Sequence, residues 1–369
     1  MGIKAVKFGG SSLADAQHFR RVAEIVRADP ARRYVVASAP GKRDRDDIKV
    51  TDMLYRCYEK ARAREDITGD FERIAERYQT IIRDLGLDFD ISGELAYICD
   101  GINHHTGRDF AASRGEYLSS LILAKYLKYD FIDAESVIFF KENGSFDSEK
   151  THHALQEELK QHERAVIPGF YGVMPNGTIK TFSRGGSDVT GSIVAEAAEA
   201  ELYENWTDVS GCLMADPRIV DNPRPIRTVT YRELRELSYM GASVLHEEAI
   251  FPVRAAGIPI NIRNTNDTSA PGTMIVAGTG EYDAQTVITG IAGRKGFSVI
   301  TIEKDMMNAE IGLGRKVLDV LEDNEISFEH LPSGVDTMSV IVASSELEGR
   351  REKLIASINR ICRPDSIVC

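Results

Sequence analysis

The sequence predicts an α/β protein in which a mainly parallel central sheet is followed by a small ferredoxin-like βαββαβ domain. Three observations lead to this prediction. Residues 1–38 have the order strand, glycine turn, helix, strand; strand-like and helical stretches then alternate up to residue 276; and residues 297–369 repeat such an alternation in a compact form. A chain of 369 residues is also long for one hydrophobic core, so we expect two domains.

The first unit begins with a strand at residues 5–8, a turn at residues 9–12, a helix over 14–28 and a second strand at 34–38. Such a unit normally builds a parallel sheet, with its ligand at the carboxyl ends of the strands. Residues 50–128 are instead amphipathic and rich in Arg, Glu, Leu and Ile, which predicts a helical insertion without strands.

Strand patterns return after the insertion. We expect strands at residues 130–134, 137–140, 165–167, 202–207, 259–263 and 273–276, a hairpin over 172–179, and helices over 189–200, 231–239 and 243–256. Few apolar anchors follow Val276, so we place the domain boundary near Tyr282 or Asp283. The two domains would be residues 1–283 and 284–369.

The second domain follows the βαββαβ order. We expect strands at residues 297–302, 326–331 and 338–343, helices over 314–324 and 347–362, and the start of a further strand at 366–369. Because that strand begins where the chain stops, we expect the domain to be truncated.

The amino-acid composition indicates which partners are excluded and which cellular compartment is expected. Hydrophobic residues make up 43% and charged residues 28%, as in ordinary globular proteins, and no apolar run reaches membrane-spanning length. The net charge of −12 argues against nucleic acid or an anionic membrane as the main partner. Five widely spaced cysteines without Cys-x-x-Cys, and no signal peptide after Met1, indicate a reducing compartment, so we expect a cytoplasmic location.

Residues 183–189 combine an arginine, two glycines, a serine and an aspartate between a predicted strand and a predicted helix. N–H groups at a helix start attract anions. Arg184 offers a planar fork for carboxylate or phosphate, and Asp188 could cap the helix or organise a cation. The alternative is an ordinary glycine-rich turn before a helix.

Two further segments suit anions: residues 7–12, with Lys7 before two glycines, and residues 206–218, which contain Thr207-Asp208 and Asp216-Pro217-Arg218. Neither is a Walker A loop, and no protein-kinase motif occurs. These segments in this order, together with the helical insertion, residues 239–246 and the final domain, resemble the aspartate kinase branch of the amino acid kinase family over the entire chain. The resemblance implies an amino acid kinase-like sandwich and a C-terminal ACT-like regulatory domain.

The implied reaction transfers the γ-phosphoryl group of ATP to the β-carboxylate of L-aspartate, the entry step to lysine, threonine and methionine. Because two anions must meet, catalysis consists mainly of positioning and charge neutralisation. Lys7 would stabilise the transferring phosphoryl group, Gly9 and Gly10 would offer it N–H groups, and Asp188 would hold Lys7 or the metal-bound phosphates. The alternative for Lys7 is a solvated charge at a strand end.

The resemblance also implies which residues bind the substrates. Arg184 would bind the α-carboxylate of aspartate and Glu116 its ammonium group, unless Glu116 is a surface helix glutamate. Further contacts to aspartate would come from Ser38, Thr51 and Ser187. Nucleotide contacts would come from Lys7, Gly9, Gly10, Ser11, Thr207, Asp208, Gly211, Leu213, Asp216, Arg218 and Ser243. Ser243 replaces the usual lysine, so nucleotide affinity falls unless another cation such as Arg218 compensates. Mg²⁺ would arrive with ATP, without a dedicated protein cage.

The ACT-like domain would bind lysine or threonine as an effector between paired subunits, in a homodimer or larger oligomer. Its candidate effector residues are Met307, Ile311, Gly312, Ser333, Val335 and Asp336, although the glycines there are equally ordinary turn residues. Two other functions stay open. One is a kinase for another amino acid, such as glutamate or acetylglutamate; the other is a catalytically weak amino-acid sensor, which Trp206, Ser243 and the truncated domain would favour.

Overall fold

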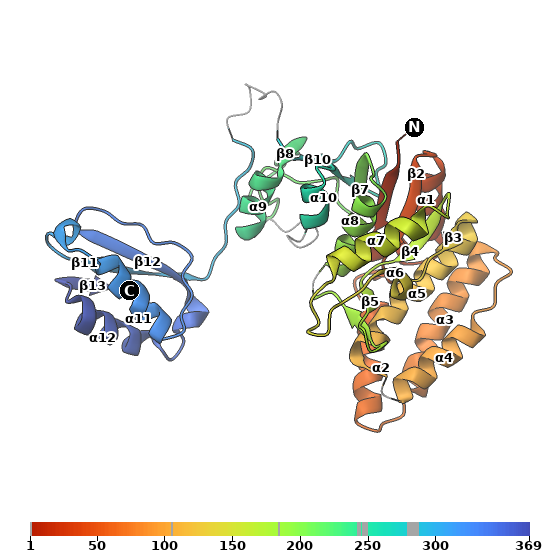
Figure 1. Ribbon diagram of the computed structural model, residues 1–369, viewed down its shortest axis with the longest axis horizontal. Helices are drawn as coiled ribbons and strands as arrows, with labels where there is room; N and C mark the ends of the chain where they lie inside the picture. Colours follow the sequence, from red (N-terminus) through yellow and green to blue (C-terminus); the bar gives the residue numbers. More distant parts are fainter. Residues whose placement is uncertain (1, 105, 184, 242–244, 246–249, 279–287) are drawn as a thin grey trace. The chain divides into compact units, whose positions relative to one another are not determined.

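The computed structural model describes residues 2–104, 106–183, 185–241, 245, 250–278 and 288–369. The chain divides into two compact units, Met1–Ala292 and Gly293–Cys369 (Figure 1). The first unit contains two clusters of buried hydrophobic residues and the second contains one. The domain boundary expected near Tyr282 or Asp283 lies outside the described residues.

The first unit is built on an eight-stranded sheet with the order β3-β4-β2-β1-β7-β9-β10-β8. Its strands are β1 (Lys4–Phe8), β2 (Arg32–Ala37), β3 (Asp130–Phe131), β4 (Ala165–Pro168), β7 (Leu202–Thr207), β8 (Thr228–Thr230), β9 (Ile260–Asn264) and β10 (Thr273–Val276). Every pairing in it is parallel except that of β9 with β10. The prediction of a mainly parallel sheet is therefore confirmed.

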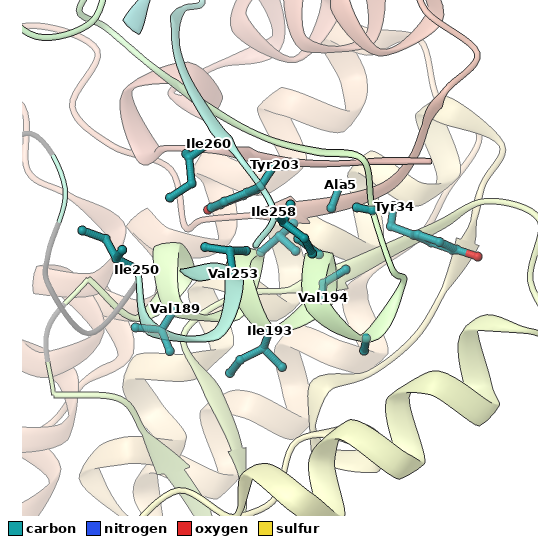
Figure 2. Close-up of a cluster of buried hydrophobic side chains, with 14 of the residues drawn as sticks. Ala5, Tyr34, Val189, Ile193, Val194, Tyr203, Ile250, Val253, Ile258 and Ile260 are labelled. Atoms are coloured by element: carbon teal, nitrogen blue, oxygen red, sulfur yellow. The ribbon is translucent and has the colours of Figure 1, made fainter. Parts of the chain in front are cut away.

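Helices cover both faces of the sheet, because apolar residues of β1 alternate between two cores. Val6 and Phe8 face a core shared with α1 and the insertion helices, and Ala5 faces the other core. Figure 2 shows this second core, where Val189, Ile193 and Val194 lie beside Ala5 and Tyr203 of the sheet. The helices involved are α1 (Ala16–Arg27), α6 (Ala134–Val137), α7 (Ser148–Leu159), α8 (Gly186–Ala197), α9 (Tyr231–Tyr239) and α10 (Phe251–Ala255).

Residues 50–128 form four helices (Figure 1), namely α2 (Val50–Arg62), α3 (Thr68–Leu85), α4 (Ser92–Asn103) and α5 (Arg108–Leu127). Helix α5 packs against α2 on one side and against β4 on the other. Its small residues, such as Ala111, Ala112 and Gly115, are buried on several sides of the helix. A helix of this kind belongs to the interior of a domain, so polar residues on it are brought into the core.

Several expected elements differ in the structure. The expected strand at 137–140 is the end of α6 followed by isolated bridges at Phe139 and Phe140, and β8 was not predicted. The hairpin does form, from β5 (Tyr171–Val173) and β6 (Ile179–Thr181). Within the described ranges, no helix is long and apolar enough to cross a membrane.

The second unit holds a three-stranded antiparallel sheet with the order β12-β11-β13. It consists of β11 (Phe297–Glu303), η3 (Met307–Ala309), α11 (Leu313–Asp323), β12 (Thr337–Ala343), η4 (Ser344–Leu347), α12 (Arg351–Cys362) and β13 (Ser366–Val368). The prediction of a strand at 326–331 is wrong. Two isolated bridges, from His330 to Ile341 and from Ser333 to Met338, lie beside β12 instead. Pro332 between them has no N–H to donate to a continuous ladder.

Candidate functional site

Lys7 and Asp188 form a close ion pair at the carboxyl end of β1. Lys7 lies two residues after Ala5 and so shares the face of β1 that carries α8, whose first turn contains Asp188. Lys7 Nζ is 2.5 Å from Asp188 Oδ1. Lys7 is only 7% exposed, so its interpretation as a solvated strand-end charge is wrong.

Asn205 holds the same carboxylate oxygen. It pairs with Lys7 across the β1–β7 ladder, and its Nδ2 donates to Asp188 Oδ1 over 2.8 Å. One oxygen of Asp188 therefore accepts from both a lysine and an amide. Asn205 was not predicted as a site residue, and its sequence signal is weak because polar Glu204 precedes it and Thr207 ends the same strand.

The glycine turn after β1 packs against the loop that follows β2. Gly41 N–H donates to Gly10 O over 2.7 Å, and a Cβ on Gly10 would lie 2.8 Å from Ala39 O. Gly9 N–H donates to Trp206 O over 3.0 Å, so a phosphate contact from that group requires this bond to break. Ser11, the other expected nucleotide contact in this turn, is half-buried in η1 (Gly10–Leu13).

The expected aspartate contacts converge on the same edge of the sheet. Ser38 follows β2 directly, and its N–H donates to Phe8 O over 3.2 Å. Ser187 packs against Gly169, whose N–H donates to Ala37 O. Thr51 is the second residue of α2, which begins where Val50 N–H donates to Pro40 O.

Glu116 reaches this edge from the interior helix α5. It is 6% exposed, so its interpretation as a surface helix glutamate is wrong. Its buried Oε2 has no hydrogen-bond partner, although the nearby backbone N–H of Ala39 favours the charged form of the carboxyl group. Burial raises the pKa of Glu116 to about 8. A buried carboxylate oxygen without a donor calls for a positively charged or donating ligand.

The residue expected to bind the other end of a small substrate, Arg184, lies outside the described residues. Its neighbour Gly185 precedes α8 with φ of 57°, a left-handed conformation that glycine adopts without steric cost. Nearby Phe170 also has a positive φ, 83°, which is unfavourable for a bulky residue. A Cβ on Gly186 would lie 2.5 Å from the Phe170 ring. Strain of this kind is typical of functional sites, and the sequence did not reveal it.

Of the expected nucleotide contacts, Thr207 ends β7, and the others lie in the segment that follows this strand: Asp208, Gly211, Leu213, Asp216 and Arg218. Gly211 has φ of 95°, and a Cβ there would lie 2.4 Å from Thr273 Oγ1, so only glycine fits. Arg218 is exposed and donates to both carboxylate oxygens of Asp216, which lowers the pKa of Asp216 to about 2. Ser243 lies outside the described residues.

The candidate effector residues fall on two adjacent segments of the second unit. Asn308 N–H donates to Val335 O and Lys304 N–H to Asp336 O, which joins residues 304–312 to residues 333–336. Ile311 is 99% exposed, Gly312 has φ of 87° before α11, and Ser333, Val335 and Asp336 are exposed, whereas Met307 is buried.

Comparisons with known proteins show which family the chain resembles. The model of the amino acid kinase family matches residues 2–264. Aspartokinase 3 of Bacillus subtilis (strain 168) is 39% identical over 99% of this chain and 84% of its own. The crystal structure of Clostridium acetobutylicum aspartate kinase is 52% identical, with a TM-score of 0.91 over 99% of this chain and 84% of that one.

A more distant structure shares the fold alone. Escherichia coli aspartokinase III, solved in complex with lysine and aspartate, is 24% identical, with a TM-score of 0.72 over 99% of this chain and 85% of that one.

Proposed function

We propose a function from one premise: this chain belongs to the amino acid kinase family, in its aspartokinase branch. The chain is an ATP-dependent aspartate kinase that forms 4-phospho-L-aspartate, the first step toward lysine, threonine and methionine. One observation carries the assignment of an amino acid as the acceptor. Glu116 lies on α5, and its buried Oε2 has no hydrogen-bond partner. This carboxyl group lies beside the loop that begins at Ser38, at the sheet edge where Lys7 and Asp188 form their ion pair.

The Lys7–Asp188 pair supports the transfer step. An oxygen of the acceptor β-carboxylate attacks the γ-phosphorus of ATP, the bond from that phosphorus to the bridging oxygen of ADP breaks, and an acyl phosphate and ADP result. Lys7 neutralises charge on the phosphoryl oxygens as they pass between two anions. Asp188 and Asn205 fix the direction of the lysine side chain, and Gly10 allows the turn after β1 to pack closely against the loop of Gly41.

The two charged groups of the aspartate backbone need partners of opposite sign. Glu116 accepts the ammonium group, and Arg184, assigned from its sequence position, holds the α-carboxylate. Ser38, Thr51 and Ser187 add hydrogen bonds around the β-carboxylate. The nucleotide lies against Ser11 and residues 207–218, where Ser243 leaves one positive charge fewer than is usual in the family.

Mg²⁺ enters as the ATP complex. Within the part of the chain that the structure describes, no three His, Cys, Asp or Glu side chains gather closely enough to hold a metal. Oδ1 of Asp188 is occupied by Lys7 and Asn205, which leaves Oδ2 as a hard oxygen ligand suited to Mg²⁺. The ion would mainly be held by phosphate oxygens and water, and it would neutralise charge on the β- and γ-phosphates.

The second unit is proposed to be an ACT-like regulatory domain that binds lysine or threonine between paired subunits. This proposal is supported by the backbone hydrogen bonds that join residues 304–312 to residues 333–336. They bring the start of α11, which Gly312 precedes, beside an exposed loop. A homodimer or larger assembly follows from this pairing. The five cysteines are free thiols, which supports the expected cytoplasmic location.

The acceptor is tested by incubating the chain with Mg-ATP and, separately, L-aspartate, L-glutamate or N-acetylglutamate. We expect ADP release and a hydroxylamine-trapped acyl phosphate with aspartate and far less with the others. Absence of turnover, or equal turnover with glutamate, would contradict the assignment. Calorimetry that shows tight lysine or threonine binding without nucleotide binding would instead support the sensor function.

A further inference from the structure

We propose that Arg77 is a positioning residue for phosphoryl transfer, which fixes the nucleotide-side loop and the aspartate-side loop relative to each other. The inference rests on the proposed kinase function. Arg77 lies on α3 in the helical insertion, is not one of the expected site residues, and is 7% exposed.

The guanidinium of Arg77 binds backbone carbonyl groups of two separate segments. Its Nη2 donates to Ala14 O over 2.9 Å and to Gly41 O over 2.7 Å, and its Nε donates to Ala14 O over 3.2 Å. Ala14 directly follows the short helix η1, which begins at Gly10, and Gly41 lies within the loop of residues 38–49 that joins β2 to α2. One planar guanidinium group therefore contacts both segments.

The two loops contact each other next to the guanidinium of Arg77. Gly41 donates its N–H to Gly10 O over 2.7 Å and gives its own carbonyl oxygen to Arg77. A Cβ on Gly41 would lie 2.6 Å from the carbonyl carbon of Gly10, so the backbones are in van der Waals contact. Any displacement of Gly41 therefore displaces Gly10, which lies beside the phosphoryl position, relative to Ser38.

A carboxylate compensates the buried charge. Arg77 Nη1 donates to Asp47 Oδ2 over 2.8 Å, and Arg43 binds Asp47 through two further side-chain bonds. These groups line one wall of a cavity of about 410 Å³ that Arg73 and Glu76 of the same helix also line. Only a planar group with several fixed donors can reach Ala14, Gly41 and Asp47 at once, and an ammonium group cannot.

The test compares Arg77→Lys and Arg77→Ala with Arg73→Ala in the full chain. Arg73 lies one turn earlier on the same helix, lines the same cavity and is exposed. Because misplacement by about 1 Å can reduce a rate about 100-fold, we expect kcat to fall about 100-fold for Arg77→Ala and about 10-fold for Arg77→Lys. Arg73→Ala should keep the wild-type kcat.

Two measurements separate positioning from general loss of structure. Each loop still binds its own substrate, so the Kd of a non-hydrolysable ATP analogue and the Kd of aspartate, each measured alone, should stay within about threefold of wild type. Guanidinium ion, at concentrations far below those that unfold proteins, should partly restore the kcat of Arg77→Ala and leave Arg73→Ala unchanged. If Arg77→Ala does not fold, Arg77→Lys provides the test: its kcat should fall while both Kd values stay within about threefold of wild type.

The outcomes that overturn the inference are distinct from those that overturn the function. A wild-type chain that turns over aspartate, with Arg77→Lys also at the wild-type kcat, overturns the positioning role alone. A proportional rise in both Kd values with an unchanged kcat does the same. A folded wild-type chain without turnover overturns the kinase function and this inference with it.

Discussion

The ammonium nitrogen of Lys7 lies 2.5 Å from Oδ1 of Asp188, although the two residues come from a strand and a helix far apart in the sequence. The contact exists because β1 and α8 pack together, with Lys7 and Ala5 on the same face of the strand. Asn205, beside Lys7 on β7, donates to the same oxygen. The pair is thus held from three elements before any substrate binds.

Replacing Lys7 by alanine should reduce kcat about 100-fold or more, because the phosphoryl group loses its main source of positive charge. A coupled assay for ADP release measures the change. Lys4→Ala is the matched control, since Lys4 lies on the same strand but pairs with Asp29, and it should keep the wild-type kcat. A Lys7→Ala enzyme with a kcat within about threefold of wild type would exclude the electrostatic role.

Aspartate binding should become tighter as the pH rises from about 6 to about 8, because burial raises the pKa of Glu116 to about 8 and only its carboxylate form attracts the ammonium group. Near neutral pH the empty site is mostly protonated, so binding should release a proton. Calorimetry in buffers of different ionisation enthalpy measures that release. Glu116→Gln should bind more weakly and show neither the release nor this pH dependence; the same proton release in this variant would contradict the assignment.

Glu116 also determines the direction in which its contribution to the free energy of unfolding changes with pH. The pKa of Glu116 is higher in the folded chain than its ordinary value of 4.5, so the folded state binds more protons between that value and about 8. The contribution of Glu116 to the free energy of unfolding is therefore fully present at low pH and declines as the pH rises through about 8. Denaturant titrations of Glu116→Gln should show a flatter pH dependence than wild type over this window.

Gly10→Ala should impair both stability and turnover. Its Cβ would lie 2.8 Å from Ala39 O and 3.2 Å from Gly41 N, and these are backbone atoms. Separating the loops should cost about 1–3 kcal/mol of unfolding free energy and reduce kcat about 100-fold. In Gly93→Ala, within α4, the added Cβ has open space; this variant should gain up to about 1 kcal/mol and keep its activity. Equal behaviour of the two variants would refute the importance of the loop contact.

The sheet, the strand that carries Lys7 and the helix start that carries Asp188 could be predicted from the sequence, because strand alternation and glycine turns are local signals. Asn205 was missed because its importance depends on which strand pairs with β1, and strand order is set by tertiary packing. Glu116 could not be placed in the interior from its pattern, since a helix buried on several sides has no amphipathic stripe. The contact of Gly10 with Gly41 and the role of Arg77 depend on the backbone path of two loops, which no periodicity records.

The most direct test of the whole account is the structure of the full chain bound to L-aspartate and a non-hydrolysable ATP analogue. We predict that Glu116 contacts the ammonium group, that Arg184 contacts the α-carboxylate, and that the β-carboxylate faces the γ-phosphate beside Lys7. A substrate pose in which either Glu116 or Arg184 is turned away from the aspartate would contradict the proposed site.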